Sequence, residues 1–320
     1  MTAQAPAFAW LNGRIVPWDE CVLHARSPAA FWGANVFEGI RAYWDETDGQ
    51  LYAFRMAEHL TRLGRSMKSL HLSIEYTDAD LARACQELLV ANDFEQDCHI
   101  CVVAYFDLGS SFDPMHHTTE TGVHITATPA PRSAAHERGL AATISSWRRI
   151  SDDSMPPRIK TGANYHNSRL AQHEAARNGY DTALLLNQRG TVSEAPGSCV
   201  IMVRDGRLVT PPATSGVLEG ITVDTVARLA ASELGVDLSR REIDRTELYV
   251  ADELFLCGTM SELAPITSVD RIPVGDGEVG PLTRSLQKHY DQTVRGRSGP
   301  PDWSTPMRPV AVPDVEETRT

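Results

Sequence analysis

The sequence predicts an α+β fold built from two domains. Strands and helices are mixed along the chain rather than strictly alternating, and hairpin turns such as Asn12-Gly13 are frequent, which favours α+β over a doubly wound parallel sheet. The 320 residues, 42% of them hydrophobic, are long for one small domain. Residues 128–135 form a stiff stretch with little to bury, which predicts a linker. We expect a small N-terminal domain (1–128), a linker (129–138), a large C-terminal domain (139–296) and a flexible tail (297–320).

The N-terminal part combines apolar runs of strand length with two amphipathic helices. Apolar residues at three- and four-residue spacing, from Leu60 to Leu70, predict a helix that begins near Met56. A second helix begins after Thr77, where Thr77-x-x-Asp80 resembles a capping box. The predicted strands cover residues 8–16, 36–44, 51–54, 99–106 and 122–128.

The C-terminal part is predicted to hold strands at 140–147, 182–187, 191–203 and 207–210, then a further strand, short helix and strand that end at Gly258, and three longer helices. The first helix covers 167–178 and ends at Gly179, the second runs from the Gly220-Ile221-Thr222 start to Gly235, and the last covers about 281–296. Residues 299–320 are rich in proline and lack apolar periodicity. We therefore expect a disordered or loosely draped tail.

Composition argues against several functional classes. The formal net charge of −12 argues against a general nucleic-acid-binding surface. No apolar run approaches the roughly 20 residues of a membrane helix, so we expect no membrane partner and cytoplasmic residence. The six cysteines are too sparse for a secreted disulfide framework. Cys98-x-x-Cys101 is more typical of a buried strand than of a metal site, and His116-His117 of a polar loop, so no metal is expected.

Lys160 is one of only three lysines among 30 basic residues. Arginine keeps its proton in proteins, whereas a lysine amine can lose it and become a nucleophile. Lys68 and Lys288 fit solvent-facing helix positions, but Lys160 lies in a loop between Pro156-Pro157 and a Gly-Ala-Asn-Tyr turn. It could form a Schiff base with an aldehyde or ketone, and the alternative is an ordinary surface lysine.

Three further spots carry groups that would complement such an amine. Glu194 is a carboxylate among apolar residues, and the helix start at Gly220-Ile221-Thr222 offers free N–H groups and a hydroxyl to an anion. Cys257-Gly258-Thr259 ends a strand with another glycine and hydroxyl. Each feature alone also fits a helix cap or a turn.

The order of these features resembles a known family. Lys160-x-x-x-x-Tyr165, Ser193-Glu194-Ala195, Gly220-Ile221-Thr222 and Gly258-Thr259 follow one another, with Val36-Phe37-Glu38-Gly39-Ile40-Arg41 near the front. Together they resemble the class IV pyridoxal-phosphate aminotransferases, and the branched-chain amino acid aminotransferases among them. The similarity covers about residues 8–295 and implies the fold-type IV architecture.

The resemblance implies pyridoxal 5′-phosphate as cofactor and a role for each matching residue. Lys160 would bind the cofactor covalently and move the proton at the substrate Cα, while Glu194 would pair with the pyridine nitrogen. Tyr165 would hydrogen-bond the phenolic oxygen. Arg62, Ile221, Thr222 and Thr259, with Gly220 and Gly258 beside them, would hold the phosphate, and Leu218 would lie against the ring. An amino donor and a 2-oxo acid would react in turn by a ping-pong mechanism, in a homodimer or higher homo-oligomer.

The substrate half departs from the family pattern. Relatives have Tyr-x-Arg where this chain has Cys98-His99-Ile100, and tyrosine where it has Trp32. With Ile100 in place of an arginine, we expect glutamate to be a poorer donor than an apolar amino acid. Ser198-Cys199 replaces a usual asparagine. The candidate substrate residues are Trp32, Phe37, Gly39 and Met260 for the pocket wall, and Arg41 for a carboxylate.

Two alternatives remain open. A lyase of the same fold, similar to aminodeoxychorismate lyase, would use Lys160 and Glu194 to expel a leaving group and would need no oxo-acid acceptor. A binding or scaffold protein that has lost catalysis is the second, although the intact Lys160, Glu194, Arg62 and Thr222 argue against it. A serine hydrolase is excluded, because Ser193 is not followed by the glycine of a nucleophile elbow.

Overall fold

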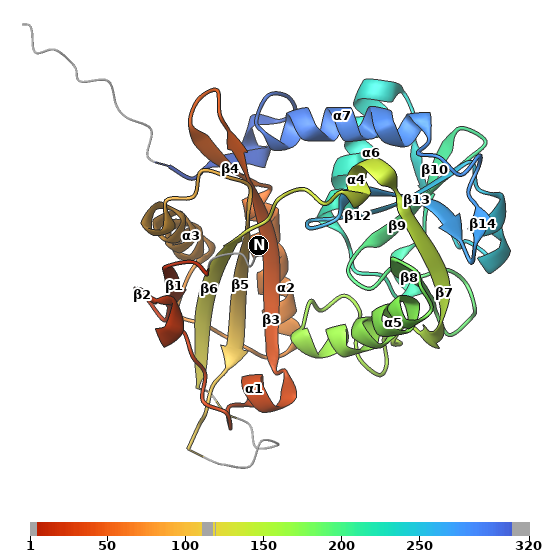
Figure 1. The fold of residues 1–320 in the computed structure, drawn as a ribbon. Helices are drawn as coiled ribbons and strands as arrows, with labels where there is room; N and C mark the ends of the chain where they lie inside the picture. Colours follow the sequence, from red (N-terminus) through yellow and green to blue (C-terminus); the bar gives the residue numbers. More distant parts are fainter. Residues whose placement is uncertain (1–4, 111–117, 119, 309–320) are drawn as a thin grey trace, which may run out of the picture.

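The protein folds as two β-sheets with helices packed against them, in a computed structural model that describes residues 5–110, 118 and 120–308 (Figure 1). The first sheet has the order β15-β4-β3-β5-β6-β1-β2, with antiparallel pairs. The second has the order β11-β10-β9-β12-β13-β7-β8 and mixes parallel with antiparallel pairs. The α+β prediction is confirmed.

The strands of the first sheet are β1 (Phe8–Leu11), β2 (Arg14–Pro17), β3 (Asn35–Asp45), β4 (Gln50–Phe54), β5 (Cys98–Phe106), β6 (Thr121–Pro129) and β15 (Ser304–Pro306). Those of the second are β7 (Leu140–Arg148), β8 (Thr182–Leu186), β9 (Cys199–Arg204), β10 (Arg207–Thr210), β11 (Leu238–Arg240), β12 (Glu253–Gly258) and β13 (Glu262–Val269), with β14 (Ile272–Pro273) paired to β13. The α-helices are α1 (Pro28–Trp32), α2 (Met56–Ser69), α3 (Asp78–Asn92), α4 (Ala135–Arg138), α5 (Tyr165–Arg177), α6 (Ile221–Leu234) and α7 (Pro281–Val294). Short 3-10 helices are η1 (Trp18–Glu20), η2 (Gly162–Asn164), η3 (Ala213–Ser215), η4 (Arg245–Val250) and η5 (Pro301–Trp303).

Helices α2 and α3 cover one face of the first sheet. Helix α3 begins with the capping box predicted at Thr77 and Asp80. Alternate residues of a strand point to opposite faces, so one set of strand positions packs under the helices and the other faces away. The apolar contacts of the helix-covered face include Val36, Ile40, Leu60, Leu63, Ile100 and Val102.

Helices α6 and α7 pack on the second sheet, and their core continues into the first. Leu229 and Leu286 from these helices lie in one apolar cluster with Phe255 of β12. Tyr43 of β3 and Phe54 of β4 belong to the same cluster. Figure 1 shows α7 running above the space between the two sheets, which explains how this cluster can join them. The arrangement fixes the two sheets relative to each other.

The predicted flexible tail is wrong for residues 301–308. Helix η5 leads into β15, which pairs with β4 through Ser304 and Phe54. Trp303 is 3% exposed and packs edge-on against Phe54, with ring centroids 5.9 Å apart. Residues 301–308 are structured because β15 pairs with a strand that lies 250 residues away in the sequence. Neither the proline content nor the local apolar periodicity indicates such a pairing. Residues 309–320 lie outside the described part.

Three further expectations concern membranes, metals and cysteines. No described helix is long and apolar enough to cross a membrane. Within the described residues, no cluster of His, Cys, Asp and Glu side chains is arranged to hold a metal ion. Cys98 is buried in β5 and Cys101 is half-buried, both as free thiols. His116 and His117 lie outside the described residues.

Candidate active site

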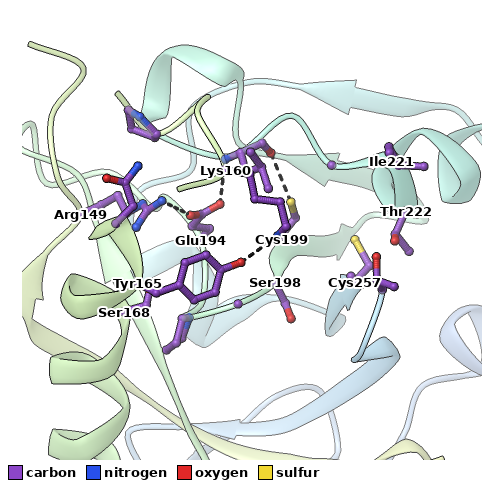
Figure 2. Close-up of a pocket in the computed structure, with 18 of the residues that line it drawn as sticks. Arg149, Lys160, Tyr165, Ser168, Glu194, Ser198, Cys199, Ile221, Thr222 and Cys257 are labelled. Carbon is purple, nitrogen blue, oxygen red and sulfur yellow. Dashed lines mark hydrogen bonds and ion pairs between the residues drawn. The ribbon is translucent and has the colours of Figure 1, made fainter. Parts of the chain in front are cut away.

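One cavity is lined by every residue predicted to hold the cofactor. It lies between the loop that follows β7, the loop that precedes β9 and the start of α6. Figure 2 shows Glu194 and Arg149 toward one end, Thr222 and Cys257 toward the other, and Lys160 with Tyr165 between them. The predicted residues in its lining are Arg62, Lys160, Tyr165, Glu194, Leu218, Gly220, Ile221, Thr222, Gly258 and Thr259.

Lys160 is held by backbone contacts while its amine reaches the cavity. Its carbonyl accepts a hydrogen bond from Phe37 N at 2.9 Å, and its own N–H donates to Ser66 Oγ at 3.3 Å. The Nζ atom donates to Tyr165 Oη at 2.8 Å and lies 4.8 Å from the centre of the Phe37 ring. The loop therefore presents a half-buried amine beside a phenol oxygen.

Glu194 lies in a bent segment rather than in the strand predicted over 191–203. The bend occurs at Pro196-Gly197, and β9 begins only at Cys199, so that prediction is wrong for residues 191–198. Ser193 N and Glu194 O pair with the backbone of Leu185 at 2.9 Å each, which fixes the carboxylate against β8. Pro and Gly are the signal that could have placed this break.

Arg149 is a site residue that sequence analysis missed. Its Nη2 atom lies 2.7 Å from Glu194 Oε1, and its Nε donates to Gly216 O at 3.2 Å. Leu218 N donates to the other carboxylate oxygen at 2.9 Å. Burial raises the pKa of Glu194, and the Arg149 charge and the Leu218 N–H oppose that shift. No local pattern at Arg149 marks it, because it follows a strand as any surface arginine would.

The opposite end of the cavity is formed by the start of α6 and by two close-packed glycines. Gly220 caps α6 without a side-chain hydrogen bond, so the first N–H groups of the helix remain free to bind an anion. A Cβ at Gly220 would lie 2.9 Å from Cys199 Sγ, and one at Gly258 would lie 3.3 Å from Gly197 O. Larger residues at these positions would narrow the cavity.

Arg62 belongs to a buried ionic group behind this end. Its Nε and Nη2 atoms each donate to a Glu38 oxygen at 2.7 Å, and Nη1 donates to Glu219 O at 2.9 Å. His59 Nδ1 also lies 2.7 Å from Glu38, whose side chain is 0% exposed. Burial alone would raise the pKa of Glu38, but Arg62 and His59 outweigh it and lower that pKa to about 2. Two of the five guanidinium N–H groups of Arg62 have no partner among the described residues.

A second cavity of about 580 Å³ adjoins the first and shares Lys160 and Tyr165 with it. Of the predicted substrate residues, Phe37, Gly39 and Met260 line it. His99 lines it too, and a Cβ at Gly39 would collide with the His99 ring. Burial, with Lys160 and Arg41 nearby, lowers the pKa of His99 to about 4, so the imidazole is neutral near pH 7. We call this space the substrate cavity.

Two predicted substrate residues line neither of these cavities. Arg41 is 2% exposed, donates to Ala130 O at 2.6 Å, and lies within 4 Å of Asp97 and Glu262. Because its guanidinium is already bound in this buried network, Arg41 stabilises the packing of the protein and does not bind substrate. Trp32, at the end of α1, is 51% exposed and packs against the Phe31 ring.

Ile100 does not face the substrate cavity, although the expectation that glutamate is a poor donor depended on its doing so. It is 0% exposed in the core under α2 and α3, because strand alternation turns His99 rather than Ile100 toward the site. The inference that Ile100 replaces a substrate-binding arginine is therefore wrong. The expectation that glutamate is a poor donor loses its structural support.

The chain is similar to known proteins along nearly its whole length. The sequence model of the family described as amino-transferase class IV matches residues 35–269. A probable branched-chain-amino-acid aminotransferase from Aquifex aeolicus is 37% identical over 302 residues, 94% of this chain and 96% of the relative.

Solved structures agree with these sequence matches. The PLP-form (holo-form) of branched-chain amino acid aminotransferase from Thermobaculum terrenum is 44% identical, with a TM-score of 0.89 over 95% of this chain and 99% of that one. Branched-chain aminotransferase from Thermoproteus uzoniensis with norvaline is 38% identical, with a TM-score of 0.88 over 94% and 99%. The chain therefore belongs to the class IV aminotransferase family, as a pyridoxal-phosphate-dependent transaminase similar to branched-chain amino acid aminotransferases.

Proposed function

We propose that the protein binds pyridoxal 5′-phosphate in the first cavity and moves an amino group between an amino acid or amine and a 2-oxo acid. The observation that carries the proposal is the position of Lys160. Its amine lies at the junction of the two cavities, with Tyr165 beside it and Glu194 and the α6 start at opposite ends. A site of this kind could hold a cofactor on one side and admit a substrate on the other.

The groups that line the first cavity suit the chemistry of this cofactor. An amine is needed for its aldehyde, and Lys160 supplies one. A buried carboxylate suits its ring nitrogen, and Glu194 is held 2.7 Å from Arg149. The free N–H groups at Ile221 and Thr222, together with Arg62, suit its phosphate. Gly220, Gly258 and Thr259 would surround the phosphate, and Leu218 would lie against the ring.

When bound, the cofactor supplies an electron-withdrawing ring that stabilises negative charge at the substrate Cα. In this proposal the Lys160 amine removes and returns the proton at that carbon. Tyr165 Oη, which accepts a hydrogen bond from Lys160 Nζ at 2.8 Å, orients the amine. Glu194 holds a proton on the ring nitrogen, and Arg149 favours the charged form of that carboxylate. Arg62 fixes the phosphate end through its own attachment to Glu38.

The two substrates would use the substrate cavity in turn, so that the first product leaves before the second substrate binds. Phe37, Gly39, His99 and Met260 would shape the space for the side chain. No arginine lines this cavity among the described residues, which supports a substrate carboxylate site that differs from that of the relatives.

Exposed apolar side chains at Phe31 and Trp32 support the further proposal that a second copy covers α1 in a homodimer. Cytoplasmic residence also remains a proposal.

Borohydride trapping tests the central bond. Protein purified with pyridoxal phosphate is reduced and digested, and the label is expected on the Lys160 peptide. The Lys160→Ala variant should take up no label, whereas Lys288→Ala, at an exposed position of α7, should label as the wild type does. A colourless protein, or a label on another side chain, would refute the cofactor proposal.

Turnover tests the reaction. Norvaline with a 2-oxo acid should yield the exchanged amino acid and oxo acid, with parallel lines in double-reciprocal plots. Turnover of the donor without any oxo acid would instead support the lyase alternative.

A further inference from the structure

A third cavity, of about 380 Å³, adjoins the α6 end of the first cavity. The two cavities share four lining residues, Cys199, Leu218, Gly220 and Ile221, so the segment that leads into α6 is a wall common to both (Figure 2). The rest of the lining comes from α2, from the loop that follows β10, from the first turn of α6 and from β11. The third cavity therefore lies between the helix layer of the first sheet and the second sheet.

Two arginines of this cavity have guanidinium groups that are free to bind a ligand. Arg65 is exposed on α2 and Arg240 is exposed on β11, so they approach the cavity from the first sheet and from the second sheet respectively. Within the described residues, neither side chain makes a hydrogen bond or an ion pair. A guanidinium keeps its charge in a protein and presents several N–H donors in one plane. Both groups can therefore donate to an anion.

The other charged residues of the cavity leave it with a net positive charge. Arg55 is buried and binds Asp224 and Glu58 at 2.7 Å each, so Arg55 and Asp224 neutralise each other. Glu219 is exposed, and it is the backbone carbonyl of this residue, not its carboxylate, that binds Arg62. Three arginines and two acids line the cavity, so one positive charge remains after the acids are subtracted.

The remaining walls are mostly apolar, with side chains from Pro211, Ala213, Val217, Leu218 and Val223. The hydroxyl of Thr210 lines the cavity too, but it already donates to Val200 O at 2.7 Å. Apolar walls with a few charged groups are typical of small-molecule sites, which occupy about 300–1,000 Å³. A suitable ligand has a small apolar body and an anionic group with oxygens for two guanidinium groups. A phosphate monoester has both, because its phosphate carries three free oxygens and close to two negative charges at neutral pH.

We propose that the third cavity binds a small phosphate monoester, with the phosphate between Arg65 and Arg240 and the organic body against the apolar wall. This site is separate from the cofactor site, because Arg62, Thr222 and Thr259 line the first cavity and not the third. The ligand joins α2, which packs on the first sheet, to β11, which belongs to the second sheet. It also lies against the segment at Gly220 that lines the first cavity.

Isothermal titration calorimetry tests the proposal on holoenzyme whose cofactor has been fixed to the protein by borohydride reduction. The cofactor phosphate then fills its own site throughout the titration. The probes are phenyl phosphate and phenyl sulfate, which have nearly the same shape but carry close to two charges and one charge respectively at neutral pH. Arg65→Met and Arg240→Met each remove one charge and keep the side-chain length, and Glu219→Gln removes the opposing carboxylate. Arg207→Met is the control, because Arg207 is exposed on β10 and does not line the cavity.

We expect Arg65→Met and Arg240→Met each to weaken the binding of phenyl phosphate by roughly tenfold, the effect of one charge-assisted contact at a partly open site. Glu219→Gln should tighten binding by roughly two- to fivefold, because it removes a like charge. Arg207→Met should match the wild type. Phenyl sulfate should bind the wild type roughly tenfold more weakly than phenyl phosphate. The affinity for phenyl phosphate should fall as NaCl is added.

A wild type that does not bind phenyl phosphate, equal affinity for the two probes, or a loss in Arg207→Met as large as in Arg65→Met would overturn the inference. Unchanged affinity in both Arg65→Met and Arg240→Met would also overturn it, because the probe would then bind elsewhere. Circular dichroism and light scattering verify the fold and oligomeric state of each variant, and Arg240→Met with Glu219→Gln decides the question if Arg65→Met does not fold. The titration measures binding and not turnover, so a failure of the proposed transamination is detected separately.

Discussion

The buried carboxylate of Glu38 offers the sharpest test of how the cofactor end is held. It accepts hydrogen bonds from both sides of the Arg62 guanidinium and from His59 Nδ1, each at 2.7 Å, and it is 0% exposed. Glu38→Gln keeps the size of the side chain and removes its charge. Arg62 then stays buried beside a neutral amide, so the change removes the ion pair without opening a cavity.

The size of the effect follows from the pKa of Glu38, which falls from 4.5 to about 2 in the folded protein. A difference of about 2.5 pH units at about 1.4 kcal/mol per unit corresponds to about 3 kcal/mol of stability. The loss of one partner of a buried ion pair typically costs about 3–5 kcal/mol, which agrees. Because the folded-state pKa is the lower one, this stabilisation is complete above about pH 4.5 and is lost as the pH falls toward about 2.

Urea unfolding at pH 7 and pH 3 measures this effect, at one protein concentration and with the same cofactor saturation. We expect Glu38→Gln to lose about 3 kcal/mol at pH 7 and about 1 kcal/mol at pH 3, where Glu38 is already protonated in the unfolded chain but still largely ionised in the folded protein. The affinity for pyridoxal phosphate, from fluorescence titration, should fall in parallel, because Arg62 is no longer fixed.

Glu58→Gln is the matched control. Glu58 lies on α2, the helix that carries the Glu38 partners His59 and Arg62, and it pairs with Arg55 at 2.7 Å, but its side chain is 36% exposed. An exposed pair of this kind should contribute at most about 1 kcal/mol. Equal stability of Glu38→Gln and wild type at pH 7, or a difference that does not change with pH, would refute the reasoning.

Three further predictions concern other contacts. Tyr165→Phe removes the oxygen that accepts a hydrogen bond from Lys160 Nζ at 2.8 Å. It should slow the single-turnover reaction with norvaline by roughly 10–100-fold, measured by stopped-flow absorbance. An unchanged rate would contradict the role of Tyr165 in orienting the Lys160 amine. Burial raises the pKa of Glu194 and the Arg149 charge lowers it, so Arg149→Met should raise this pKa further. The acid limb of the pH profile of kcat/KM should then move to higher pH. Arg149→Lys should restore part of the profile, and an unshifted limb would count against the pairing. Trp303→Ala should cost about 3–5 kcal/mol in urea unfolding, and a loss below about 1 kcal/mol would mean that β15 is not part of the core.

Much of the cofactor end could be predicted because its residues depend on local geometry. Gly220-Ile221-Thr222 indicates a helix start with free N–H groups wherever it occurs, and Gly258-Thr259 indicates a strand end that lets another chain segment approach. The Lys160 loop is set apart by its prolines and glycine. The order of these features along the chain matched the family, and the structure places them around one cavity.

The substrate side depended on which face of a strand each residue takes. His99 and Ile100 are neighbours in sequence, yet one lines the substrate cavity and the other is buried under α2 and α3. A shift of one residue in register exchanges those faces, and the apolar run 99–106 is buried on both sides, so alternation is hard to see in the sequence. The expectation for Ile100 failed for this reason. Arg41 lies opposite His99 on the neighbouring strand, and the expectation for it failed because its guanidinium is held by Ala130 O, Asp97 and Glu262.

By itself the sequence determined the α+β class, the capping box at Thr77, and the amine, carboxylate and helix start of the cofactor end, because turns, caps and glycines act over a few residues. Only the tertiary structure decided that Arg149 pairs with Glu194, that Arg41 is tied to Glu262 and Asp97, and that β15 completes the first sheet. Charge pairs and strand pairs join residues far apart in sequence, and their partners are selected by packing that no local pattern records.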